Sequence, residues 1–98
     1  MALNTKPWDA ASQLDTPERI ALYLEAAFED GDSALIAAAI GDAARAYGMT
    51  RLAKDTGLAR EALYRALSED GNPEFATVLK VLRVFGLRLA AVEDDEAA

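Results

Sequence analysis

The side chains best suited to chemistry lie around residue 60, where arginine, glutamate and tyrosine recur at helical spacing. Within residues 49–67, MTRLAKDTGLAREALYRAL, a helix is predicted over about 59–67. Arg60, Glu61, Tyr64 and Arg65 would lie together on its exposed side. Arginine can bond two acceptors on a guanine edge, glutamate can accept from cytosine, and tyrosine and arginine can hold phosphates. The pattern favours a helix that reads DNA, although the same side chains are also typical of a solvated helix face.

A preceding helix and a glycine turn would hold this helix in place. Thr50 is the predicted N-cap of the preceding helix, because its hydroxyl can accept a hydrogen bond from a free backbone N–H. Gly57 suits the left-handed conformation that ends a short helix. Two short helices joined at a glycine are typical of a helix-turn-helix, and they also occur in other all-helical domains. The residues of the second helix predicted to face inward are Ala62, Leu63, Ala66 and Leu67.

Composition limits both the fold and the chemistry. The 98 residues suffice for one domain, and alanine and leucine outweigh the β-branched residues, which predicts an all-α fold. The absence of cysteine and histidine excludes disulfides, thiolate nucleophiles, imidazole bases and the usual zinc ligand sets. Glu69, Asp70 and Glu74 could be imagined as a metal site, but their order is that of a turn and a helix start. We therefore expect no enzyme, metal or cofactor.

Charge is unevenly distributed along the chain, whose formal net charge is −7. Residues 45–88 hold eight basic and five acidic side chains, whereas the rest of the chain holds two basic and twelve acidic ones. Phosphate binding depends on lysine and arginine, so the basic half could contact nucleic acid. The acidic remainder could bind a basic protein, or it could merely keep a small domain soluble.

Five helices are predicted, with ends set by caps, prolines and glycines. The first would begin at Thr16-Pro17-Glu18 and end at Asp30-Gly31, and the second would run from the cap Asp32 to Gly48. Gly41 inside the second helix predicts either close packing against another backbone or a slight break. The last helix would begin at Asn72-Pro73-Glu74 and end at Gly86. The predicted buried residues are Ile20, Tyr23, Leu24, Ala27 and Phe28, then Leu35, Ile36, Ala39, Ile40 and Ala43, and finally Phe75, Val78, Leu79, Leu82 and Phe85.

Both ends of the chain are predicted to lie outside the helices of a domain spanning residues 16–92. Residues 1–15 would form an extended N-terminal arm that Trp8 pins onto the domain. Residues 87–92 alternate like a short C-terminal β-strand, whose partner would be the N-terminal arm or the same strand of a second copy at a dimer interface. Residues 93–98 would form a disordered acidic tail. No apolar run approaches the roughly 18 residues of a membrane span, so we expect a cytoplasmic protein without membrane contact.

Three stretches carry a family resemblance: DTPERIALYLEAAFEDGD, GDAARAYGMTRLAKDTGLAREALYRALSEDGNPEF and ATVLKVLRVFGLRL. Through them the chain resembles, from about Thr5 to Leu89, the HigA-like addiction module antidote proteins, which are antitoxins with a helix-turn-helix domain like that of lambda and other phage repressors. The resemblance implies a DNA-binding repressor of its own operon that also neutralises a small basic toxin of the RelE/ParE type. The run TGLAREALYRALSEDGNPEF is the most specific of the matches.

Carried over position by position, the resemblance implies two groups of DNA-contacting residues. Serine would be expected at position 59, and Ala59 lacks the hydroxyl that would cap the recognition helix, a loss of typically about 1 kcal/mol. The expected readers of DNA are Ala59, Arg60, Glu61, Tyr64 and Arg65, with Thr50, Arg51 and Lys54 near the phosphate backbone.

One recognition helix buries too little surface for useful specificity, so a homodimer is expected to place two of them in successive major grooves of double-stranded operator DNA, roughly 34 Å apart. Two alternatives remain at this stage. The chain could be a stand-alone helix-turn-helix transcriptional regulator without a toxin. It could also be a protein-interaction module without DNA binding, in which the acidic first helices bind a basic partner through Glu18, Glu25, Glu29 and Asp30.

Overall fold

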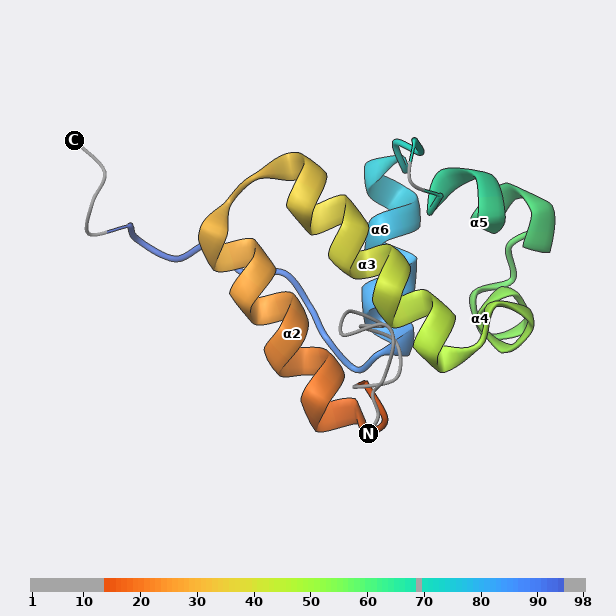
Figure 1. Ribbon diagram of the computed structural model, residues 1–98, viewed down its shortest axis with the longest axis horizontal. Coiled ribbons are helices and arrows are strands. Elements are labelled where there is room, and N and C mark those ends of the chain that lie inside the picture. The colour runs from red at the N-terminus through yellow and green to blue at the C-terminus, as the bar shows by residue number, and fades with distance from the viewer. Residues whose placement is uncertain (1–13, 69, 95–98) are drawn as a thin grey trace, which may run out of the picture.

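The computed structural model describes residues 14–68 and 70–94, and these residues form five α-helices and no strand (Figure 1). The fold is therefore all-α, as predicted. None of these five helices is long and apolar enough to span a membrane. The helices are α2 (Pro17–Asp30), α3 (Ser33–Tyr47), α4 (Met49–Thr56), α5 (Arg60–Ala66) and α6 (Phe75–Val84).

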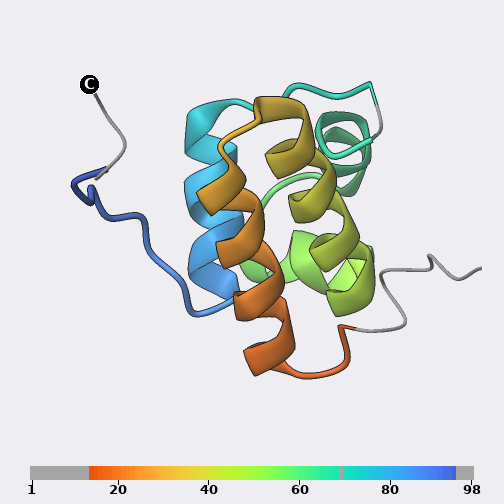
Figure 2. The same ribbon diagram turned by 60° about the vertical axis from the view of Figure 1, so that its left-hand side comes forward.

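The ends of α2 and α3 confirm the predicted capping residues. Thr16 Oγ1 accepts a hydrogen bond from the backbone N–H of Arg19 at 3.1 Å, and Asp32 Oδ2 accepts one from Leu35 at 2.9 Å. Gly31 ends α2 in the left-handed conformation, with φ of 85°. Such caps satisfy backbone groups that the helix itself leaves free. They turn the chain sharply, so that α2 and α3 pack side by side as a helical hairpin (Figures 1 and 2).

The predicted starts of α4 and α6 are wrong by one to three residues. Helix α4 begins at Met49 with Gly48 as its cap, so Thr50 is the second helical residue and makes no cap. Gly48 has φ of 106°, which lets the chain leave α3 and enter α4 at the same residue. Helix α6 begins only at Phe75, because Glu74 has extended backbone angles, and no side chain caps it.

The core contains residues from all five helices and from the segment before α2. Its largest fully buried side chains include Leu24 of α2, Ile40 of α3, Leu52 of α4, Leu63 of α5 and Leu82 of α6. Burial of this apolar area is the main stabilising term for such a small domain. Leu14, which was assigned to the N-terminal arm, is also part of this core. Trp8 and the rest of residues 1–13 lie outside the described residues, as do residues 95–98 of the predicted tail.

Four residues predicted to face the core are exposed instead: Leu35, Ala62, Phe75 and Leu79. Leu35 lies in the first turn of α3, and Ala62 lies on the outer side of α5. In α6 the buried positions are Val81 and Leu82. Helical spacing alone allows either Leu79 or Val81 to be buried on the same face as Leu82. Helix α6 packs against α4, and Val81 is the residue that this packing buries.

Close packing of α3 against the end of α5 explains Gly41. A Cβ atom at position 41 would lie 2.8 Å from the backbone oxygen of Leu67. Helix α3 is continuous from Ser33 to Tyr47, so the predicted alternative of a break does not apply. The missing side chain lets the backbone at the C-cap of α5 come close to α3.

The prediction of a β-strand over residues 87–92 is wrong for this chain. Gly86, at φ of 82°, ends α6 with hydrogen bonds from its own N–H to Arg83 and from that of Leu87 to Leu82. The following residues form no strand, and among residues 14–68 and 70–94 there is no second strand to pair with them. Alternating side chains give residues 87–92 two different faces, but a β-strand also needs hydrogen bonds to the backbone of a partner strand. The segment instead runs past α2 and then away from the helices (Figures 1 and 2).

Candidate functional site

Helices α4 and α5 form a pair joined by a three-residue connection. Gly57 is left-handed, with φ of 78°, and its N–H donates to the carbonyl of Ala53 at 2.9 Å. Thr56 Oγ1 donates to the carbonyl of Leu52 at 2.8 Å and accepts from the N–H of Leu58 at 3.2 Å. These bonds fix the angle at which α5 leaves α4, and the buried Leu52 and Leu63 anchor the two helices in the core.

Helix α5 presents the predicted ridge of polar side chains to solvent. Arg60, Glu61, Tyr64 and Arg65 are all exposed, whereas Leu63 and Leu67 are buried beneath them. Arg60 Nη2 donates a hydrogen bond to Tyr64 Oη at 3.1 Å, and the Arg60 Cζ atom lies 4.9 Å from the centre of the Tyr64 ring. The guanidinium of Arg60 therefore reaches one helical turn along the ridge, where Tyr64 limits its movement.

Ala59 occupies the N-cap position of α5. Its backbone is extended, with φ of −67° and ψ of 135°, and it makes no side-chain cap to α5. The first N–H groups of a helix need partners other than the helix itself. On α5 they lie beside exposed side chains, and they could be satisfied by water or by an anion.

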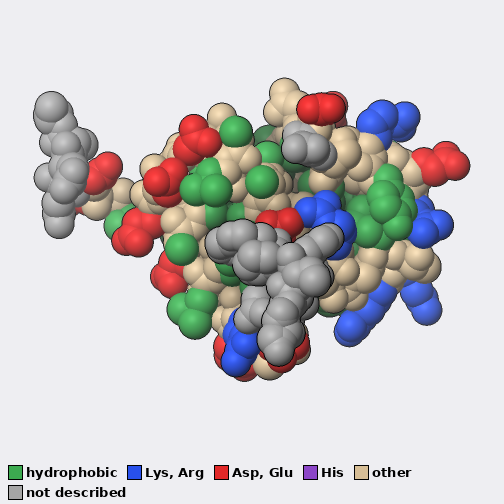
Figure 3. Space-filling model, viewed as in Figure 1, with side chains coloured by type: hydrophobic (Ala, Val, Ile, Leu, Met, Phe, Trp, Pro, Cys, Tyr) green, Lys and Arg blue, Asp and Glu red, His purple; other side chains and the backbone are tan. Residues whose placement is uncertain are grey.

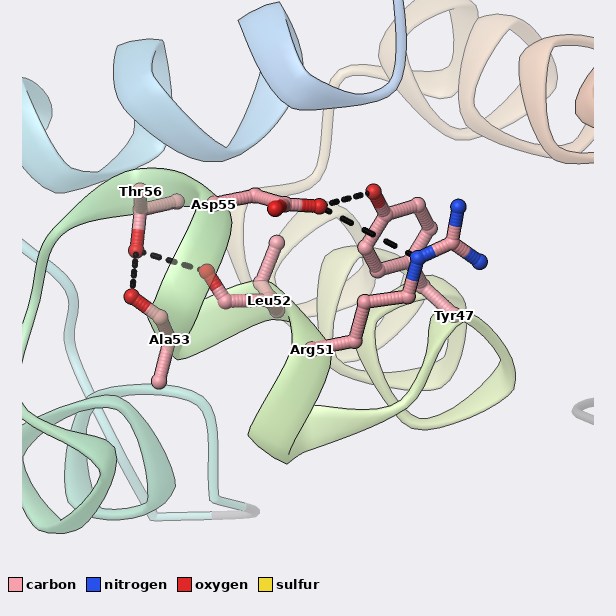
Figure 4. A network of polar contacts seen from close by, with 6 residues as sticks. All are labelled: Tyr47, Arg51, Leu52, Ala53, Asp55 and Thr56. Atoms are coloured by element: carbon pink, nitrogen blue, oxygen red, sulfur yellow. Dashed lines mark hydrogen bonds and ion pairs between the residues drawn. The ribbon is translucent and has the colours of Figure 1, made fainter.

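Arg51 on α4 belongs to a polar network that the sequence reasoning missed (Figure 4). Its Cζ atom lies 4.3 Å from the centre of the Tyr47 ring, and its Nε atom lies 3.9 Å from Asp55 Oδ2. Tyr47 Oη donates a hydrogen bond to the same Asp55 oxygen at 2.5 Å, and this bond, more than burial, raises the pKa of Tyr47. Tyr47 also packs edge-on against Phe85. The network ties the end of α3 to α4 and restrains the guanidinium of Arg51 at the surface.

A spacing of four residues from Tyr47 to Arg51 and from Arg51 to Asp55 was the signal in the sequence for this network. Gly48 separates α3 from α4 between Tyr47 and Arg51, so the spacing within one helix did not predict their contact. Thr50 and Lys54, the other predicted residues of α4, are exposed. Exposure leaves both side chains available to a partner.

The molecule has a positive end and a negative end (Figure 3). Residues 49–66, which form α4 and α5, hold four basic side chains and two acidic ones. Residues 15–32, which include α2, hold six acidic side chains and one basic one, Arg19, which is paired with Asp15 at 3.5 Å. A polyanion is attracted to the first end and repelled by the second.

Among the described residues, no three Asp or Glu side chains are placed to hold a metal ion together. Of the acidic trio considered from the sequence, Asp70 and Glu74 are exposed, and Glu69 lies outside the described residues.

Comparison with known proteins gives one family. Residues 4–93 match the model of a family described as "Probable addiction module antidote protein". The chain is also similar to a protein of Haemophilus influenzae described as an uncharacterized protein. The two are 44% identical over 88 residues, which cover 90% of this chain and 91% of that protein. No solved structure matches the chain.

Proposed function

The chain belongs to the family of probable addiction module antidote proteins, and from this premise we propose that it is the antitoxin of a type II toxin–antitoxin module. In this proposal it acts in the cytoplasm, as a HigA-like helix-turn-helix protein. As a dimer it binds operator DNA and represses its own operon. It also neutralises a small basic toxin of the RelE/ParE type by direct binding.

The exposed ridge of α5 is the observation that supports DNA binding most directly. A recognition helix needs several hydrogen-bonding side chains on one outward face, held by a buried opposite face. Arg60, Glu61, Tyr64 and Arg65 provide that face, and Leu63 and Leu67 hold it. In the proposed complex, Arg60 and Glu61 contact base edges near the start of α5, while Tyr64 and Arg65 contact phosphates or bases further along.

Helix α4 supplies the proposed contacts to the phosphate backbone. Thr50, Arg51 and Lys54 are exposed on this helix, and Ala59 lies at the N-terminal end of α5. Such contacts set the position of the protein on DNA without reading sequence. Because α5 has only seven residues, specificity would need a second copy, with half-sites roughly 34 Å apart.

A gel-shift experiment tests the DNA-binding part. The full chain is titrated into the DNA upstream of its own gene and into a shuffled duplex of equal length. We expect a shift on the natural duplex at a protein concentration at least about tenfold lower, with binding that weakens as salt rises. Equal affinity for both duplexes would contradict operator recognition, and no shift at low salt would contradict DNA binding altogether.

The acidic end of the molecule favours one alternative, a protein-interaction module that does not bind DNA. Glu18, Glu25, Glu29 and Asp30 are exposed on α2 and could contact a basic protein while α4 and α5 serve only as scaffold. A complex with a small basic protein, together with no shift of any duplex, would favour this alternative. A stand-alone regulator would instead shift its duplex and form no complex with a small basic protein.

A further inference from the structure

We infer that the groove between α2 and α3 is the docking surface for the toxin, and that it takes a basic polypeptide segment with an apolar side chain at its centre. The inference rests on the proposed function, because it names the surface for the toxin of that proposal. The groove is lined by Tyr23, Ala26, Ala27, Leu35 and Ala39.

Apolar side chains are exposed at this groove although the core is close by. Leu35 forms part of its wall and is 45% exposed, and Ala26 on the facing wall is exposed as well. Exposed apolar side chains that line a hollow can contact an apolar side chain of a partner. The small side chain of Ala26 would let a partner's backbone come close to α2.

The walls of the groove are held in place before any partner arrives. Tyr23 Oη donates to Asp42 Oδ2 at 2.7 Å, and Asp42 also pairs with Arg45 on the next turn of α3. The bond from Tyr23, a residue of the groove wall, links α2 to α3. A preformed surface loses less entropy when a partner binds.

Charge identifies the chemistry of the occupant. Asp32 accepts a hydrogen bond from the N–H of Leu35 in the groove wall. Four more exposed carboxylates lie on α2: Glu18, Glu25, Glu29 and Asp30. The basic residue of this helix, Arg19, is already paired with Asp15. An apolar groove beside so many carboxylates fits a partner whose apolar residue is flanked by lysine or arginine.

The same charges argue against other occupants. Two copies of this chain joined through this groove would bring their acidic end residues together, which like-charge repulsion disfavours. DNA and anionic lipid would be repelled for the same reason. The turn that joins α2 to α3 lies at the end of the molecule away from α4 and α5 (Figure 1), so a toxin seated near this turn leaves the proposed DNA surface free.

Two matched variants test the inference. Leu35→Lys changes an exposed leucine that lines the groove, and Leu79→Lys makes the same change on α6, where the leucine is exposed to a similar extent, 38% against 45%. Each is co-expressed with the protein encoded by the reading frame adjacent to its gene, and binding is measured by calorimetry with the purified proteins. Circular dichroism and the gel shift show whether each variant is folded.

We expect Leu35→Lys to weaken the complex by about tenfold or more and Leu79→Lys to change it by less than about twofold. Glu29→Gln should weaken it less and reduce its salt dependence. Equal effects of the two lysine variants would overturn the inference while leaving the antitoxin function intact. If the unmodified chain does not bind the adjacent product, the toxin part of the proposed function fails, and the inference fails with it.

Discussion

The guanidinium of Arg51 lies over the ring of Tyr47, with 4.3 Å between Cζ and the ring centre, while Asp55 lies 3.9 Å from its Nε atom. Asp55 therefore places a negative charge beside an arginine proposed to contact phosphate. The ring of Tyr47 keeps the guanidinium in place without adding charge.

This arrangement predicts that Asp55→Asn strengthens DNA binding by about two- to fivefold, the effect expected of one exposed charge. Asparagine can still accept the hydrogen bond from Tyr47, so the ring should stay in position. Fluorescence anisotropy with natural and shuffled duplexes measures the change, with Arg51→Ala as the weakening control. Weaker binding by Asp55→Asn would mean that the carboxylate positions Arg51 instead of opposing it.

Arg60 and Lys54 are predicted to contribute differently to DNA binding. Arg60→Ala should cost about 1–3 kcal/mol and relax the preference at one base position, because a bidentate contact to a base is lost. Lys54→Ala should weaken binding to all sequences alike and flatten the salt dependence. Competition with duplexes that differ at single positions separates the two effects. Equal losses by both variants on natural and shuffled duplexes would count against α5 as the reading helix.

Ala59 offers a simple test of the cap that α5 lacks. Ala59→Ser should raise the free energy of unfolding by about 1 kcal/mol, because a serine hydroxyl at this extended N-cap can accept an N–H of the first turn. Ala62→Ser is the matched control, since Ala62 is also exposed but lies within the helix, where serine has a lower helix propensity. Urea denaturation compares the two. If Ala59→Ser is no more stable than Ala62→Ser, the missing cap does not reduce the stability of the fold.

Tyr23 should make the fold sensitive to alkaline pH. Burial, with a smaller contribution from the hydrogen bond to Asp42, raises the pKa of Tyr23 from 10.0 to about 12. The folded chain thus holds this proton more tightly than the unfolded chain. The resulting stability is complete below about pH 10 and is lost as the pH rises towards 12.

The variant Tyr23→Phe should therefore have a free energy of unfolding that changes less with pH in this alkaline range. Urea denaturation at a series of pH values measures the slope, and near-ultraviolet absorbance follows tyrosine ionisation. Loss of the most alkaline absorbance step in the variant would identify that step with Tyr23. An unchanged slope and an unchanged titration would contradict the assignment.

Local chemistry made much of this fold predictable. The caps at Thr16 and Asp32 and the turn at Gly57 depend on neighbours within a few residues, and all three were placed correctly from the sequence. The outward ridge of α5 followed from helical spacing in the same way. What the ridge binds stays a prediction.

Features that depend on residues distant in sequence were missed or misplaced. Val81 is buried in preference to Leu79 because of how α6 meets α4, and the strand over residues 87–92 failed because alternation says nothing about a partner. Arg51 could be named from the sequence, but its contact with Tyr47 depends on the sharp turn at Gly48. Such contacts are decided by the packing of helices against one another. The spacing of residues along a single helix carries no information about that packing.

The opposite charges of α2 and of the α4–α5 pair give the molecule a permanent electric dipole moment along its length (Figure 3). Near a polyanion such as the proposed operator DNA, this moment would produce a torque that turns the α4–α5 end forward and α2 away. A protein of net charge −7 can thus approach a polyanion in a productive orientation at low ionic strength. Screening by salt removes the torque together with the attraction.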